Sequence, residues 1–66
     1  MGILKVIEVL SNSNKSWEDA TKKAFQQASK TLKNIRSVYV QDQSATTSGG
    51  EVDEFRVNLK INFEVN

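Results

Sequence analysis

The sequence predicts an α+β fold, in which a three-stranded antiparallel sheet with the strand order 1-3-2 wraps around a single helix. Within the predicted strand of residues 52–65, the residues from Phe55 onward alternate between apolar and polar side chains, which is the period of a strand with one buried face. Residues 16–34 instead carry apolar side chains at three- and four-residue steps, the period of an amphipathic helix. Two more strand-like segments flank that helix, so the order of elements is strand, helix, strand, strand.

The first predicted strand, residues 3–10, is rich in β-branched residues and apolar on both of its faces. Its apolar residues comprise Ile7 and Val9 on one face and, on the other, Leu4, Val6 and Leu10. A strand that is apolar on both faces is normally packed against other elements on both sides. In a chain with one helix, the second cover must come from a neighbouring subunit or from the ends of the chain itself. Residues 11–14 are predicted to form a turn, because Ser and Asn side chains bond to nearby backbone.

The predicted helix begins at Ser16, a residue type that caps the first turn, and Glu18 and Asp19 lie near the positive end of the helix dipole. The apolar side of the helix is formed by Trp17, Ala20, Ala24, Ala28, Leu32 and Ile35, and it is flanked by Phe25 and Thr31. The opposite face carries lysines and is expected to face water. Because no Gly or Pro ends the helix, its end is predicted near residues 33–34. Trp17, in line with Ala20 and Ala24, is interpreted as a residue that fills the core rather than as a stacking platform for a ligand.

The second predicted strand, residues 36–43, is followed by a polar connection, residues 44–50, that leads into the long strand. A right-handed crossover makes the first two strands parallel, and the hairpin makes the third antiparallel to the second. The long strand therefore lies in the middle of the sheet. On the face away from the helix, two sets of side chains are expected to lie side by side: Ser37, Tyr39 and Gln41, and Glu54, Arg56 and Asn58.

The long strand is too extended for one helix to cover. Fourteen residues of strand span about 46 Å, whereas the helix reaches only about 25 Å. A chain of 66 residues also has a thin core, and it has no cysteine or histidine to provide a disulfide or a structural zinc site. Self-association therefore remains as the way to complete the fold. We expect one domain, residues 1–66, that forms a homo-oligomer.

Composition excludes several classes of function. Nine basic and eight acidic residues give a net charge of +1, which is too balanced for a dedicated nucleic-acid-binding protein. Lys5 and Glu8 interrupt the apolar N-terminal stretch, so neither a signal peptide nor a membrane span is expected, and a cytoplasmic location is predicted. The absence of histidine and cysteine removes the commonest proton shuttle and nucleophile, and no catalytic motif is present. An enzyme is therefore not expected.

A few acidic residues near the turn and the long strand offer the oxygen ligands that a hard cation such as calcium prefers. They are Asp42, Glu51, Asp53 and Glu54. A scattered acidic set of this kind is more often solvated surface, so no metal ligands are assigned. The mixed hydrogen-bonding groups on the face away from the helix could instead accept a planar ligand between symmetry-related copies, or form the wet interior of an assembly.

The sequence resembles the dodecin family of small flavin-binding proteins. Four blocks carry the resemblance, and they agree in order and spacing: residues 5–8, 16–20, 32–36 and 55–63. The resemblance implies a strand-helix-strand-strand subunit and a hollow spherical homododecamer. It also implies flavin bound in stacked pairs at interfaces, held by a tryptophan directly after the helix-closing arginine and by a glutamine on the last strand. This chain has Ser37 and Arg56 at those positions, and Ser44-Ala45 in place of an arginine-glycine pair.

The predicted function is that of a non-enzymatic, dodecin-like homododecamer that stores a small ligand, with FMN or riboflavin as the first candidate. Ser37 and Arg56 are predicted to face the ligand, with Tyr39 and Gln41 nearby. Serine has no π-face to stack on a flavin, and arginine cannot replace an amide that both donates and accepts hydrogen bonds. The alternative is therefore a flavin-independent cage that binds calcium or acts as an interaction shell. A small enzyme that depends on Glu54 or Lys60 is a further alternative.

Overall fold

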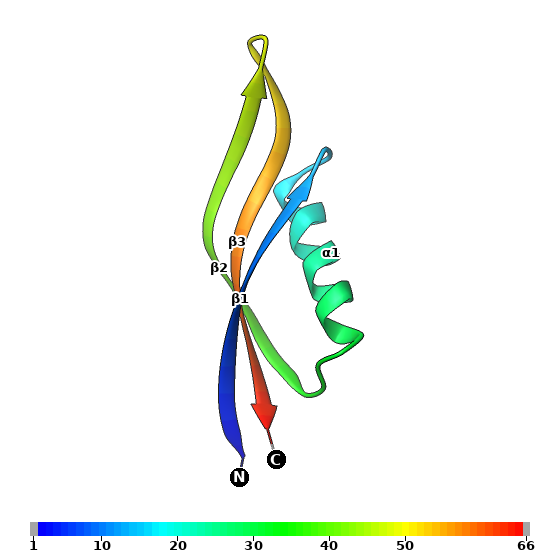
Figure 1. Cartoon of the computed structure of the whole chain (residues 1–66), viewed down its shortest axis with the longest axis vertical. Helices are drawn as coiled ribbons and strands as arrows, with labels where there is room; N and C mark the ends of the chain where they lie inside the picture. The colour runs from blue at the N-terminus through cyan, green and yellow to red at the C-terminus, as the bar shows by residue number, and fades with distance from the viewer. Residues whose placement is uncertain (1, 66) are drawn as a thin grey trace.

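The computed structural model describes residues 2–65 and contains four elements: β1 (Ile3–Ser13), α1 (Trp17–Ser29), β2 (Ile35–Ser48) and β3 (Glu51–Val65). The strands form one antiparallel sheet in the order β1-β3-β2, with α1 against one face (Figure 1). The predicted fold class and strand order are confirmed. The predicted domain covers residues 1–66, of which residues 1 and 66 lie outside the described part. Among the described residues, no helix has the length and apolar character needed to cross a membrane.

β1 is longer than predicted, because residues 11–13 form strand rather than turn. The whole of β1 pairs with β3, from Ile3 opposite Val65 to Ser13 opposite Phe55. The serine side chains donate to the helix: Ser11 Oγ donates to the Ala20 carbonyl at 2.9 Å, and Ser13 Oγ donates to Asp19 at 2.6 Å. Ser13 Oγ also accepts from the Lys15 backbone N–H at 2.9 Å, which is the local bonding expected of a serine near a turn. The hydrogen bonds to the helix stabilise the extended conformation that local propensity disfavours.

α1 begins as predicted and ends earlier. The Ser16 hydroxyl accepts a hydrogen bond from the Asp19 backbone N–H at 3.0 Å, which caps the first turn. The helix ends at Ser29, so the prediction of an end near residues 33–34 is wrong. The connection to β2 passes through Asn34, whose φ of 62° is left-handed and incompatible with a continuing helix. The Asn34 carbonyl accepts a hydrogen bond from the Glu64 backbone N–H at 3.0 Å, which fixes this exit to the sheet.

The hairpin between β2 and β3 is tighter than predicted. β2 extends to Ser48, so the assignment of residues 44–50 to a polar connection is wrong for all but its last two residues. Gly49 and Gly50 form the turn, with φ values of 59° and 81°. Positive φ at both central residues is the requirement of a type I′ hairpin turn, and glycine meets it without steric cost. The glycine pair therefore closes the hairpin at its tip and sets its register.

The buried core is small and lies in the middle of the molecule. Val57, Leu59 and Ile61 of β3 are fully buried, and the only other buried apolar side chains among the described residues are Ala20 and Ala24 of α1. The small alanine side chains pack with Val57 and Leu59 in this core. Both ends of the sheet continue beyond the helix, so that the molecule measures 51 × 19 × 13 Å (Figure 1).

The shape of the single chain is unusually extended. The radius of gyration is 13.6 Å, compared with about 11 Å for a compact domain of this length. The accessible surface is 4872 Å², compared with about 4,200 Å² for a typical monomer of this mass. The chain thus leaves uncovered a sheet that one helix is too short to cover, which agrees with the mismatch of lengths in the sequence.

Candidate functional site: the open face of the sheet

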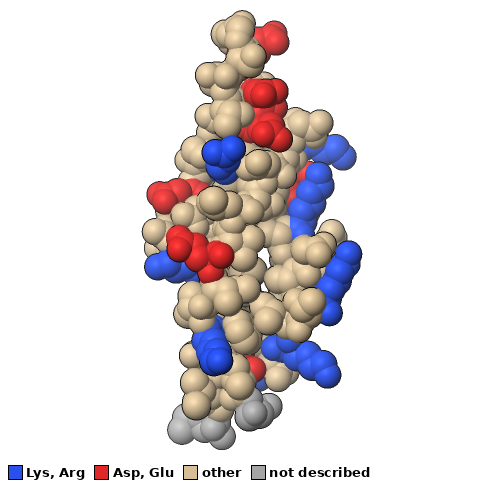
Figure 2. All heavy atoms as spheres, in the orientation of Figure 1, with Lys and Arg blue, Asp and Glu red and all other residues tan. Residues whose placement is uncertain are grey.

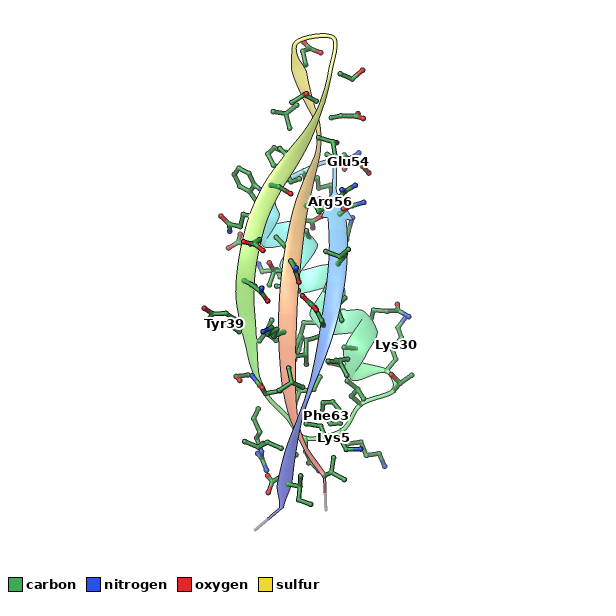
Figure 3. All side chains as sticks on the ribbon, turned by 60° about the vertical axis from the view of Figure 1, so that its left-hand side comes forward. Lys5, Lys30, Tyr39, Glu54, Arg56 and Phe63 are labelled. Atoms are coloured by element: carbon green, nitrogen blue, oxygen red, sulfur yellow. The ribbon has the colours of Figure 1, made fainter. Side chains whose placement is uncertain are left out.

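The face of the sheet that α1 does not cover is termed the open face. Its central row is formed by the even-numbered residues of β3, because Val57, Leu59 and Ile61 point to the helix. Figure 3 shows the sheet lying in front of the helix. Directly opposite residues share a face, so the register places polar β2 residues on one side of this row and the apolar residues of β1 on the other.

The β1 side of the open face is an apolar stripe. It is formed by Leu4, Val6 and Leu10, which are all exposed, and Glu8 interrupts it between Val6 and Leu10. This finding agrees with the prediction that β1 needs cover on both of its faces. On the other side of the central row, Ser37 and Tyr39 project from β2. The open face thus has mainly apolar side chains on its β1 side and hydrogen-bonding side chains on its β2 side.

Ser37 lies opposite Asn62, and Tyr39 lies opposite Lys60. The Asn62 side-chain amide donates a hydrogen bond to the Ser37 hydroxyl at 2.9 Å. The hydroxyl thereby accepts one hydrogen bond and keeps its own proton for a further partner. The Tyr39 ring is 60% exposed and is the aromatic group of this part of the face. On its β1 side, Lys60 lies opposite Glu8.

Arg56 lies in a different part of the open face from Ser37. It pairs with Asn12 and with Ser44, and its Nε donates to the Asn12 side-chain oxygen at 3.0 Å. Asn62, the partner of Ser37, is six residues further along β3, which corresponds to about 20 Å. The predicted register between β2 and β3 is therefore wrong. It placed Ser37, Tyr39 and Gln41 beside Glu54, Arg56 and Asn58. The tight glycine turn accounts for the difference, because it pairs β2 with β3 from the tip of the hairpin.

Gln41 occupies a β-bulge. Val40 pairs with Leu59 and Asp42 pairs with Asn58, so that Gln41 is an additional residue in the ladder. As a result, Asp42 rather than Gln41 takes the paired position beside Asn58. The Asn58 side-chain oxygen is buried and has no hydrogen-bond partner among the described residues. An alternating pattern gives no signal for a bulge, so the place of Asp42 beside an unpartnered amide oxygen was missed.

Trp17 does not belong to the open face. Its ring packs edge-to-face on Phe55, with centroids 5.0 Å apart and an interplanar angle of 76°. Its indole Nε1 donates to the Ser44 carbonyl at 2.8 Å. Trp17 thus joins the start of α1 to β2 and β3. It packs against Phe55, but it is 36% exposed and lies outside the buried core, so the prediction of a core residue is wrong.

The acidic residues considered for a hard cation are divided between two places. Asp42 lies beside Asn58, whereas Glu51, Asp53 and Glu54 lie near the tip of the hairpin. Within residues 2–65, no group of three or more acidic side chains is arranged to hold a metal ion. A cation site built from these carboxylates would consequently need ligands from a second copy.

Glu64 ties together three distant parts of the chain. Arg36 donates to its carboxylate through Nε, at 2.9 Å, and through Nη2, and the Gly2 backbone N–H donates to it at 3.1 Å. A side chain on Gly2 would collide with Glu64 and Val65, since a Cβ there would lie 2.8 Å from their atoms. The Arg36 hydrogen bonds, followed by the Gly2 N–H, lower the pKa of the Glu64 carboxyl. This cluster fixes the start of β2, directly before Ser37.

The lowered pKa of Glu64 predicts an acid-sensitive contribution to stability. The carboxylate stabilises the fold above its ordinary pKa range, and this contribution is lost as the pH falls through the lowered folded-state pKa. We expect Glu64→Gln to unfold at a lower urea concentration than the wild type at neutral pH, and the difference to disappear in acid. Glu18→Gln, on an exposed face of α1, is the matched control. The same pH profile for both variants would contradict a specific role of Glu64.

Comparison with known proteins places these features in a family. The dodecin family model matches residues 3–66. Calcium dodecin from Mycobacterium tuberculosis is 33% identical over 66 residues, covering 98% of this chain and 92% of the relative. The structure of dodecin from Streptomyces coelicolor superposes with a TM-score of 0.93 at 26% identity, over 98% of this chain and 93% of that chain. The crystal structure of calcium dodecin from Mycobacterium tuberculosis, described as calcium-chelating, has a TM-score of 0.85 at 29% identity, over 97% and 91% of the two chains.

Proposed function

Since the chain belongs to the dodecin family, we propose that it is a small-ligand-binding protein without catalytic activity, which acts as a hollow homododecamer. The observation that carries this proposal is the open face, where an exposed apolar stripe lies beside a row of hydrogen-bonding groups. Apolar residues on that scale normally mark an interaction surface. A second copy of the chain would complete the face, and a cytoplasmic location remains a prediction from the sequence.

The proposed ligand is a flavin or a similar planar molecule, held between copies by Ser37, Tyr39, Gln41 and Arg56. Tyr39 offers an exposed ring, and Ser37 retains a free hydroxyl proton. Because Ser37 and Arg56 are about 20 Å apart within one chain, a single isoalloxazine ring cannot contact both in one copy. A ligand that meets both residues therefore lies between two copies, with each copy contributing part of the site.

Ser37→Trp tests this assignment. A tryptophan at residue 37 would add stacking worth about 0.5–1.5 kcal/mol per aromatic pair, which corresponds to roughly two- to tenfold tighter binding. Titration of riboflavin and of FMN with protein, followed by quenching of flavin fluorescence, measures the affinity. Lys30→Trp, on the exposed end of α1, is the control and should leave it unchanged. Equal affinities for Ser37→Trp and the wild type would refute the placement of the ligand at residue 37.

Calcium is the second candidate, because the 33%-identical relative is a calcium dodecin. In this chain, Asp42 offers carboxylate oxygens, and it lies opposite Asn58, whose buried side-chain oxygen has no hydrogen-bond partner among the described residues. A second copy would supply the remaining ligands. Calorimetric titration with calcium chloride tests this function, with Asp42→Asn expected to abolish the heat of binding and Glu18→Gln to retain it. Calcium binding that survives Asp42→Asn would exclude this site.

A further inference from the structure

The β2–β3 arm, defined as residues 46–54, projects beyond the end of β1 and beyond the helix (Figure 1). It consists of two strands only, and a two-stranded ribbon is marginally stable in water by itself. Its anchorage within the chain ends at its base, where Trp17 contacts Phe55 and Ser44. An arm of this kind gains order when another surface packs against it.

The arm has a distinctive chemistry. It carries Glu51, Asp53 and Glu54 but no lysine or arginine, and Val52 among these acidic residues is 52% exposed. Figure 2 shows acidic side chains along the upper part of the molecule and basic side chains along the edge formed by the helix. The arm is therefore an acidic projection with an apolar contact near its tip, which fits a groove that is apolar inside and basic at its rim.

A groove of about 470 Å³ between α1 and β2 has this character. It is lined by Thr21, Lys22, Phe25, Gln26 and Val38. Phe25 is 43% exposed, although it lies on the sheet side of the helix. The arm cannot enter the groove of its own chain, because β2 and β3 carry it away from the helix (Figure 1). The occupant must come from another molecule.

Lys22 is available to an acidic partner. Its ammonium group is 4.0 Å from Glu18, at the limit of an ion pair, and its side chain is 70% exposed. The groove on the other side of the helix, between α1 and β1, has Lys23 at its rim. Lys23 is 3.2 Å from Asp19, whose carboxylate also accepts the Ser13 hydroxyl proton. Charge complementarity therefore favours the groove at Lys22 for the arm.

We propose that the β2–β3 arm of one copy docks into the α1–β2 groove of a second copy, with Val52 against Phe25 and the arm carboxylates beside Lys22. This inference rests on the proposed self-association and specifies one of its contacts. Val52 and Phe25 cover each other's apolar surface, and the charges set the register and orientation of the arm. In the assembled protein, the contact would cover the arm, which no other element of its own chain covers.

Cysteine cross-linking tests the contact directly, since the chain contains no cysteine. A mixture of Val52→Cys and Gln26→Cys chains should form a disulfide-linked dimer under mild oxidation, because docking brings the two positions within the few ångströms that a disulfide allows. Val52→Cys mixed with Lys30→Cys, at the residue that caps the end of α1 and lies outside the lining of the groove, is the control. Each single variant alone is tested in parallel. A cross-link no stronger at Gln26 than at Lys30 would refute the docking.

Charge reversal gives an independent test in solution. Glu51→Lys with Asp53→Lys should raise the concentration at which the assembly dissociates about tenfold, Lys22→Glu should do the same, and the combined variant should recover much of the loss. Light scattering measures the mass. If the wild type has a mass of 7.4 kDa at all concentrations, the proposed cage fails as well. If the wild type assembles and both charge reversals leave its dissociation unchanged, only the docking fails.

Discussion

Leu59→Ala is expected to remove a large part of the free energy of unfolding of the chain. Leu59 is fully buried at the centre of β3, against the small residues Ala20 and Ala24. Truncation of a buried leucine to alanine costs about 2–5 kcal/mol, since it removes apolar contact and leaves a cavity. A domain of this size has a free energy of unfolding of about 3–10 kcal/mol, so that the loss is comparable with the whole stability. Urea titration followed by circular dichroism measures it.

Leu10→Ala is the matched control for this prediction, because it makes the same chemical change at a residue that is 68% exposed. In a sample dilute enough to be monomeric, its cost should be below about 1 kcal/mol. A loss of stability as large for Leu10→Ala as for Leu59→Ala would show that the core is not where the structure places it.

Leu10→Lys is expected to have the largest effect on assembly. Leu10 belongs to the apolar stripe of the open face, together with Leu4 and Val6. If this stripe packs against another copy, the substitution places an unpaired charge in an apolar contact, which costs several kcal/mol. The mass from light scattering should therefore fall to that of a smaller species. The secondary structure of the isolated chain should remain, since residue 10 faces away from the helix.

Lys33→Glu is the control for the assembly prediction, because it changes the charge on an exposed residue of the connection between α1 and β2, outside the open face. Its mass should equal that of the wild type. An unchanged mass for Leu10→Lys would contradict the packing of copies through the open face and would leave the apolar stripe without a role in assembly.

The fold could be predicted because its signals are strong and local. The alternation of residues 55–65 specifies a strand with one dry face, and the spacing from Trp17 to Ala28 specifies a helix. The boundaries could not be predicted, because tertiary contacts decide them. Ser11 and Ser13 extend β1 through bonds to the helix, and Asn34 fixes the exit to β2 through a bond to β3. Local propensity contains no information about such partners.

The sequence could predict which face of the sheet forms the candidate site, but it could not predict which residues are neighbours on that face. The sequence indicates which face of β3 is polar, whereas the neighbours of each residue depend on the length of the turn and on bulges. The bulge at Gln41 moves Asp42 beside Asn58, and the turn at Gly49 and Gly50 moves Ser37 beside Asn62. A site shared between copies also depends on symmetry, which the pattern of one chain does not encode.

The pairing of Ile3 with Val65 places the two ends of the described chain at the same pole, opposite the glycine turn (Figure 1). A peptide tag or a cargo domain fused to either end would consequently be carried at that one pole, away from the arm.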